Sequence, residues 1–155
     1  MQPLLLAHSR TLMRCIRWQR EYPQTTKETD HSKPIGVGLI GYGLGGRAFH
    51  APYIRAARDL SLRAVVSRDQ GKVHADIANV AVSATVEEML ALPDIELVVV
   101  SSPDHLHADH AVQALDAGKH VVINKPFAAS LGDARRVVAA AERIGRIVTA
   151  FHNRR

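Results

Sequence analysis

Cysteine, long apolar runs and the signature of a serine hydrolase are scarce or missing in this 155-residue sequence. The one cysteine, Cys15, cannot form a disulfide within the chain, which is typical of a reducing compartment and favours a cytoplasmic location. No apolar stretch approaches the ~20 residues that a membrane-spanning helix needs, so we expect no membrane partner. A Ser-His-Asp hydrolase is not favoured either, because no Gly-x-Ser-x-Gly elbow is present.

Acidic residues are absent from the first 20 positions, although four arginines lie there. Residues 1–34 hold six Lys and Arg against three acids, while residues 35–155 hold 14 against 12. The globular part is therefore close to neutral, and we expect no nucleic-acid partner. We interpret residues 1–33 as a disordered extension and linker, with an organelle transit peptide as the alternative, and residues 34–155 as one domain.

Short, β-branched apolar segments alternate with helical patterns from residue 35 onward. Those at 96–101 and 120–123 are continuously apolar, as strands covered on both faces are. The alternation predicts right-handed βαβ crossovers and one parallel sheet. We therefore expect an α/β fold, a doubly wound Rossmann sheet of six strands in the order 3-2-1-4-5-6. The strands are expected at residues 35–40, 62–66, 80–82, 96–101, 120–123 and 146–151.

Local signals mark where the helices begin and end. Pro52 cannot lie inside a regular helix, because it lacks the N–H that would bond to residue 48. The first helix is therefore expected to break near His50–Ala51 and to restart with Pro52 in its first turn. A longer helix is expected over residues 131–144, with one apolar face. The other end signals are the capping patterns Thr85-x-x-Glu88 and Ser130-x-x-Asp133 and the terminal glycines Gly118 and Gly145.

The segment GLIGYGLGGRAFHAPYI, residues 38–54, contains the spacing G-x-G-x-x-G between the first expected strand and a helix. In a dinucleotide-binding turn Gly41 would allow the tight bend, Gly43 would let a pyrophosphate reach the backbone, and Gly46 would let the helix pack on the strand. The helix N-terminus would offer N–H groups to the phosphates. The alternative is a glycine turn that holds no ligand. The candidate cofactor-binding residues of this turn are Gly41, Tyr42, Gly43, Leu44, Gly45 and Gly46.

The residues after the second expected strand favour one cofactor over another. NAD sites place an Asp or Glu there to bind the ribose 2′-hydroxyl, whereas this sequence has Ser67 and Arg68. An arginine can hold a 2′-phosphate with two hydrogen bonds, so we expect NADP as the cofactor. In the alternative interpretation Arg68 is a surface residue and Asp69 binds the ribose of NAD.

Three segments together resemble the Gfo/Idh/MocA family, that is, the glucose–fructose oxidoreductase and inositol dehydrogenase family: GLIGYGLGGRAFHAPYI, SSPDHLHADHAVQALDAGKHVVINKPFA and FHNRR. The resemblance covers about residues 34–155. It implies a domain that binds NAD(P), which the family pairs with a C-terminal α/β domain that supplies much of the substrate pocket. We expect this second, substrate domain to be absent, so that the chain is truncated and weak or inactive alone.

The resemblance also implies roles at the ends of the fourth and fifth strands. Asn124-Lys125-Pro126 is similar to the family's Glu-Lys-Pro, which has a cis bond before proline and whose lysine lies by the nicotinamide and the substrate. Lys125 is therefore the candidate catalytic residue, because it can donate to a substrate oxygen. Asn124 departs from the family's acidic residue and keeps an acceptor without the charge. The cofactor contacts that the resemblance implies are Ser101, Ser102, Pro103, His107, Asn124, Lys125, Pro126, Asn153 and Arg154.

These observations predict the NAD(P)-binding domain of an oxidoreductase that transfers hydride between the cofactor and a sugar- or polyol-like substrate. The alternative is a non-catalytic dinucleotide-binding module or sensor. A metal site is not favoured, although His105, His107 and His110 form H-x-H-x-x-H. The first two side chains diverge at a helix start, and no cysteine stands nearby to complete a zinc site.

Overall fold

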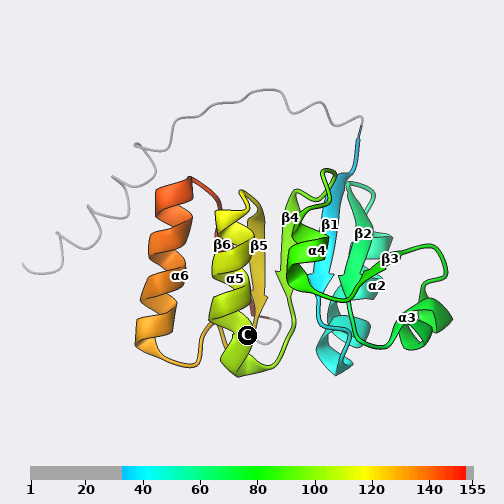
Figure 1. The fold of residues 1–155 in the computed structure, drawn as a ribbon, viewed down its shortest axis with the longest axis horizontal. Coiled ribbons are helices and arrows are strands. Elements are labelled where there is room, and N and C mark those ends of the chain that lie inside the picture. Colours follow the sequence, from blue (N-terminus) through cyan, green and yellow to red (C-terminus); the bar gives the residue numbers. More distant parts are fainter. Residues whose placement is uncertain (1–32, 153–155) are drawn as a thin grey trace, which may run out of the picture. The chain divides into compact units, whose positions relative to one another are not determined.

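The computed structural model describes residues 33–152, which form a six-stranded parallel sheet in the order β3-β2-β1-β4-β5-β6 (Figure 1). This confirms the expected doubly wound Rossmann sheet and its strand order. The expected extension over residues 1–33 lies outside the described residues except for Lys33, and so do Asn153 and Arg154. The strands are β1 (Ile35–Ile40), β2 (Leu60–Val66), β3 (Ala81–Ser83), β4 (Leu97–Val100), β5 (His120–Asn124) and β6 (Val148–Phe151).

All six strands lie where they were expected, with first or last residues that differ by one or two positions in five of them. β1 matches its expected range, whereas β2 begins at Leu60, because that residue pairs with Ile35 at the start of β1. β6 begins at Val148 rather than at Arg146. The reason is that the backbone N–H of Arg146 donates to the carbonyl oxygen of Ala141 at 3.1 Å, which makes Arg146 part of the end of the preceding helix.

Helices connect every pair of successive strands. The break expected near His50–Ala51 is confirmed, since a short π-helical turn ends at His50 and an α-helix with Pro52 in its first turn follows. The helical segments are η1 (Gly46–His50), α2 (Ala51–Ala56), α3 (Gln70–Asp76), α4 (Val86–Leu90), η2 (Asp104–Leu106), α5 (His107–Asp116) and α6 (Leu131–Ile144).

The helices form one layer on each face of the sheet (Figure 1). Helices α4, α5 and α6 pack over one face, with a core that includes Met89, Leu115 and Val137. Helices α2 and α3 pack over the other face, with a core that includes Ile54 and Val73. β4 lies between the two layers, so its alternate residues enter opposite cores, and this explains its continuously apolar sequence.

The helix ends use the expected side chains with one difference. Thr85 accepts from the backbone N–H of Glu88, and the Glu88 carboxylate accepts from the backbone of Thr85, which completes a capping box. Ser130 accepts from the N–H of Asp133, but the Asp133 carboxylate accepts from the Ser130 hydroxyl instead of the Ser130 backbone. An Asp side chain is one methylene shorter than Glu, so this cap is only half of a box. Gly118 and Gly145 end α5 and α6 with φ values of +75° and +68°.

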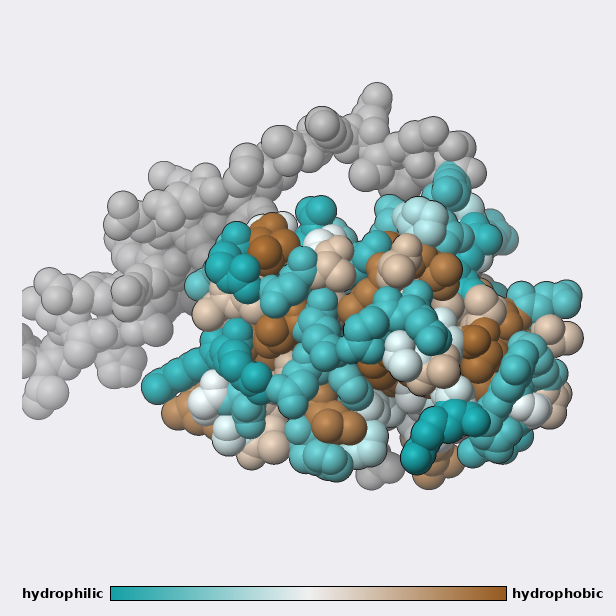
Figure 2. Space-filling view, viewed as in Figure 1, coloured by the Kyte–Doolittle hydropathy of each residue, from teal (hydrophilic) through white to brown (hydrophobic). Residues whose placement is uncertain are grey.

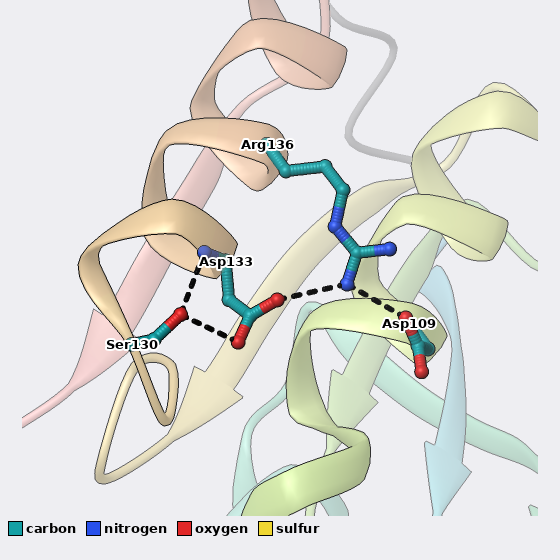
Figure 3. Close-up of polar contacts among 4 residues, drawn as sticks. All are labelled: Asp109, Ser130, Asp133 and Arg136. Carbon is teal, nitrogen blue, oxygen red and sulfur yellow. Dashed lines mark hydrogen bonds and ion pairs between the residues drawn. The ribbon is translucent and has the colours of Figure 1, made fainter.

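The contact between α5 and α6 includes one ion-pair bridge on the surface. Arg136 of α6 donates to Asp109 of α5 at 2.7 Å and to Asp133 of its own helix at 3.1 Å, and Ser130 caps the same turn (Figure 3). On the face drawn in Figure 2, hydrophobic residues lie scattered among hydrophilic ones. None of the helices between residues 33 and 152 is both long and apolar enough to cross a membrane.

Candidate functional site

The carboxyl ends of β1, β2 and β4 border a groove of about 740 Å³. β1 pairs with β2 on one side and with β4 on the other. The chain leaves β1 toward β2 and leaves β4 toward β5, so the connections after these two adjacent strands run in opposite directions. In doubly wound sheets, ligands bind at such a switch point. The groove is lined by Ile40, Gly41, Tyr42, Gly43, Val66, Ser67, Arg68, Asp69, Lys72, Ala84, Thr85, Val86, Ser102, Pro103, Leu106 and His110.

Two glycines of the turn after β1 are required by the packing of the chain itself. Gly41 has φ +95°, and a Cβ there would lie 2.6 Å from the carbonyl oxygen of Ser101. A Cβ on Gly46 would collide with the carbonyl oxygen of Gly41. These contacts agree with the tight bend expected at Gly41 and with the close helix–strand packing expected at Gly46.

Gly43 differs from its neighbours, because nothing in the described structure explains the missing side chain. A Cβ added at Gly43 would meet no atom within 4 Å, and its backbone is not in the positive-φ region. By contrast, a Cβ on Gly45 would lie 2.7 Å from Ser101 Oγ and 3.1 Å from Asn124 Nδ2. Gly43 lines the groove, and the open space at its Cα fits a bulky group held against the backbone.

Side-chain contacts between residues far apart in the sequence attach the turn to α3. Arg47 donates to both carboxylate oxygens of Asp76, at 2.6 and 2.9 Å, and the Tyr42 hydroxyl donates to the same carboxylate at 3.1 Å. The hydrogen bond from Arg47 lowers the pKa of Asp76, and burial followed by the bond to Asp76 raises the pKa of Tyr42. The Tyr42 side chain thus supports the turn from behind, while Leu44 is 78% exposed.

The loop after β2 places two cations beside the groove. Arg68 is exposed and lines the groove, as does Lys72 one turn into α3. Asp69 begins α3 by accepting from the backbone N–H of Lys72 at 2.9 Å, so one of its carboxylate oxygens is already bonded. The Ser67 hydroxyl both accepts from the N–H of Asp69 and donates to its carbonyl oxygen, which fixes the backbone between them.

The loop after β4 is held from below by histidines. His107 is completely buried, with Nε2 2.8 Å from the carbonyl oxygen of Ser102 and Nδ1 2.7 Å from that of Pro126. His110 Nδ1 lies 2.9 Å from Ser102 Oγ. Both rings therefore hold other partners than a shared metal, and no group of three candidate metal ligands occurs among residues 33–152. Ser102 and Pro103 line the groove, whereas Ser101 Oγ is buried without a hydrogen bond in the described structure.

The loop after β5 lies beyond the groove proper. Asn124 ends the strand, Lys125 is exposed, and the Lys125–Pro126 bond is cis, as the resemblance implied. His50 is 4% exposed and packs against Phe151, with ring centroids 4.7 Å apart and the ring planes tilted by 57°. Burial lowers the pKa of His50, and a hydrogen bond with the Asn124 side chain partly opposes this effect.

The predicted site residues therefore fall into two groups at one edge of the sheet. The segments after β1, β2, β3 and β4 supply the groove, and of the predicted residues Gly41, Tyr42, Gly43, Ser67, Arg68, Ser102 and Pro103 line it. The remaining described candidates surround it without lining it: Leu44, Gly45, Gly46, Ser101, His107, Asn124, Lys125 and Pro126. Lys72 and His110 also line the groove and were missed. Lys72 could have been found, because it lies in the first turn after the expected second strand.

The fold and the groove define the class of protein, a Rossmann domain of the nucleotide-binding kind. The family model described as "Oxidoreductase family, NAD-binding Rossmann fold" (GFO_IDH_MocA) matches residues 35–152. The chain belongs to this Gfo/Idh/MocA oxidoreductase family and is an NAD(P)-binding domain of it.

Individual relatives agree with this assignment. The chain is 43% identical over 124 residues to the oxidoreductase YdgJ of Escherichia coli, with 80% of this chain and 36% of the relative covered. It is 35% identical over 121 residues to scyllo-inositol 2-dehydrogenase (NADP(+)) IolW of Bacillus subtilis, with 78% and 34% covered. A Klebsiella pneumoniae crystal structure matches with 47% identity and a TM-score of 0.76, over 79% of this chain and 36% of that one. The chain thus spans about a third of the length of these relatives.

Proposed function

We propose that the chain binds a nicotinamide dinucleotide along the carboxyl edge of the sheet, with the pyrophosphate against the turn Gly41–Gly46. Gly43 carries this proposal, because its missing side chain is demanded by no contact and no positive φ within the described structure. A pyrophosphate at this position would occupy the space that a side chain would fill. We propose residues 34–155 as the dinucleotide-binding domain and residues 1–33 as an extension before it.

NADP is the cofactor that the charge beside the groove favours. Arg68 and Lys72 both line the groove next to the end of β2, where the adenosine ribose lies in this fold. Two cations would attract a 2′-phosphate, whereas Asp69 has one oxygen committed to its cap and offers less to a ribose hydroxyl. The name of the relative IolW specifies NADP(+), which supports this choice.

In the proposed reaction, the chain is the nucleotide-binding part of an oxidoreductase that acts on a sugar- or polyol-like substrate. The bound cofactor would supply the hydride chemistry. Lys125, exposed after β5, would donate a hydrogen bond to the substrate oxygen and stabilise negative charge on it. The glycine turn and the cations after β2 would hold the cofactor in place, and Ser102 and Pro103 would lie along it.

Titration of the full chain with NADPH and NADH, followed by calorimetry, tests this proposal. Gly43→Ala is expected to weaken NADPH binding by at least about 10-fold without loss of folding stability, because the new methyl would meet the pyrophosphate and nothing else. Gly132→Ala is the matched control, since it adds the same methyl in α6, away from the groove, where the nearest atom would be Ser130 Oγ at an uncrowded 3.6 Å. Equal NADPH affinity in Gly43→Ala and the wild type would refute the proposed position.

The cofactor preference is tested with Arg68→Ala. Loss of a charge-assisted contact should weaken NADPH binding by about 10- to 100-fold and leave NADH binding nearly unchanged. Arg58→Ala is the control, because Arg58 is also exposed but precedes β2 at the opposite edge of the sheet. Unchanged NADPH affinity in Arg68→Ala would remove the case for NADP.

A non-catalytic dinucleotide-binding module is the second candidate, and Asn124 favours it. The family pattern has an acidic residue before the lysine, while this chain has a neutral one at the end of β5. A module of this kind would bind NADPH and show no oxidation that depends on a sugar or polyol. An oxidoreductase would show such oxidation, and Lys125→Ala would abolish it without changing NADPH affinity by more than a few-fold.

A further inference from the structure

His107, the first residue of α5, has a side chain that is fully buried between two loops of the site. Its Nε2 lies 2.8 Å from the carbonyl oxygen of Ser102, and its Nδ1 lies 2.7 Å from the carbonyl oxygen of Pro126. Both partners are carbonyl oxygens, which only accept hydrogen bonds. A neutral imidazole carries one N–H, so it can donate to one of the two oxygens and would turn a lone pair toward the other.

The two contacts differ by only 0.1 Å, and both lie inside the range of good N–H···O hydrogen bonds. Two opposed lone pairs at this separation would repel each other inside a buried site, where no water screens them. Both contacts are favourable only when each ring nitrogen carries a proton. We propose that His107 is a positioning residue that acts as an imidazolium and fastens the loop of Lys125 to the end of β4.

The position of the ring explains what this fastening would do. Pro126 directly follows Lys125, the residue proposed to contact the substrate, and Ser102 lines the groove. The two carbonyl groups come from loops that follow neighbouring strands, β4 and β5. His107 itself does not line the groove, so it acts through these two loops. It holds the loop of Lys125, proposed to lie by the nicotinamide, at a fixed position relative to the groove proposed to hold the adenosine.

The elements around His107 carry charged and titratable side chains of both signs. These side chains are Asp104 and His105 in η2, Asp109 and His110 in α5, Glu87 in α4 and Lys125 in the loop after β5. Burial lowers the pKa of His110, the charges of Asp109 and Glu87 raise it, and the charge of His107 lowers it. Burial is the largest of these effects, so the neighbouring His110 ring is biased toward its neutral form.

Nitrogen-detected NMR of the ligand-free full chain tests the charge state directly. At pH 7.5 we expect both ring nitrogens of His107 to show the signature of protonated nitrogens, while His105, which is exposed, serves as the internal reference. A single protonated nitrogen on His107 would overturn the proposal. This result is independent of the proposed function, because no cofactor is present.

The positioning role rests on the proposed function and is tested with His107→Gln. Glutamine can donate to one of the two carbonyl groups, but not to both across this span. We expect NADPH binding to weaken about 10-fold, while adenosine 2′,5′-bisphosphate, which lacks the nicotinamide half, binds with unchanged affinity. His105→Gln should change neither affinity. Equal weakening of both ligands would show a general structural role and overturn the proposal.

If His107→Gln does not fold, the pH dependence of the two affinities in the wild-type chain tests the positioning role instead. The affinity for NADPH, divided by the affinity for adenosine 2′,5′-bisphosphate, should fall over the pH range in which NMR shows only one protonated nitrogen on His107. A constant ratio across that range would overturn the positioning role. If the wild-type chain bound neither ligand, the proposed function would fail, and the NMR result would still decide the charge state of His107.

Discussion

The two halves of the carboxyl edge differ in what shapes them. After β1 and β2 the chain leaves out side chains, at Gly43 above all, and keeps Arg68 and Lys72 exposed beside an open groove. After β4 and β5 it buries polar groups instead, with His107 bonded at both nitrogens. Ser101 Oγ, after β4, and His50 Nε2, which comes from η1 but packs against Phe151 of β6, are also buried on this side without a hydrogen bond in the described structure. Open space therefore forms the first half, and internal polar contacts form the second.

Gly41 is the point where the two halves meet, and its replacement should have the largest effect. Gly41→Ala would place a methyl 2.6 Å from the carbonyl oxygen of Ser101 and a side chain at φ +95°. Overpacking and backbone strain each cost about 1–3 kcal/mol, so we expect the free energy of unfolding to fall by about 2–4 kcal/mol. Urea denaturation measures this loss.

Gly43→Ala is the control within the same turn. Its methyl would meet nothing within 4 Å, so its free energy of unfolding should stay within about 0.5 kcal/mol of the wild type. If the two variants lost the same stability, the distinction between a glycine required by packing and a glycine left open would be wrong.

The buried polar half should make folding stability depend on pH through His50. Burial holds the pKa of His50 below its ordinary value of 6.5 in the folded chain. The unfolded chain therefore binds a proton as pH falls through that value, while folded His50 does not. The free energy of unfolding should decrease as pH falls from 7 toward the lowered pKa, and it should recover as pH rises.

His50→Leu removes the titrating group and should make the stability less dependent on pH in this range. Phe151→Leu is the matched control, because it alters the same ring contact and leaves the histidine in place. Urea denaturation at pH 7, 6 and 5 gives the slopes. An unchanged slope in His50→Leu would show that His50 does not contribute, and the lowered pKa values of His110 and His120 would then have to account for the dependence.

Sequence patterns predicted the parts of the site that depend on neighbouring residues. The strand order followed from alternating apolar segments and right-handed crossovers, and the roles of Gly41 and Gly46 followed from their spacing. The break at Pro52 and the cap at Thr85 are also local features, so a single sequence shows them.

Contacts between distant segments could not be predicted in the same way. The carboxylate of Asp76 that holds Tyr42 and Arg47 lies 34 and 29 residues away from them. His107 meets Pro126 across 19 residues, and nothing in the H-x-H-x-x-H pattern distinguishes a ring between two carbonyl groups from a ring on the surface. Such contacts depend on how the loops of separate strands meet, which the apolar pattern leaves open.

Helix caps allow a smaller test of the two halves. Thr85, which lines the groove, has a complete capping box, and Ser130, near the Lys125 loop, has half of one. Thr85→Ala should lower the free energy of unfolding by about 1 kcal/mol, because the N–H of Glu88 loses its acceptor. Ser130→Ala should cost somewhat less. Urea denaturation measures both losses of unfolding free energy. A larger loss for Ser130→Ala than for Thr85→Ala would contradict the expectation that the complete capping box contributes more.

Arg136→Ala should have the smallest effect, although Arg136 joins two helices (Figure 3). Its side chain is half exposed, as is that of Asp109, so water screens the attraction and ordering two long side chains offsets much of the gain. We expect thermal denaturation to show no shift beyond the scatter of the measurement, and no dependence of that shift on salt. Apolar contacts already hold α5 and α6 to the sheet. A clear loss of thermal stability in Arg136→Ala that disappeared at high salt would contradict this expectation. It would show that the ion pairs of Arg136, and not the apolar core beneath them, determine how α5 and α6 pack.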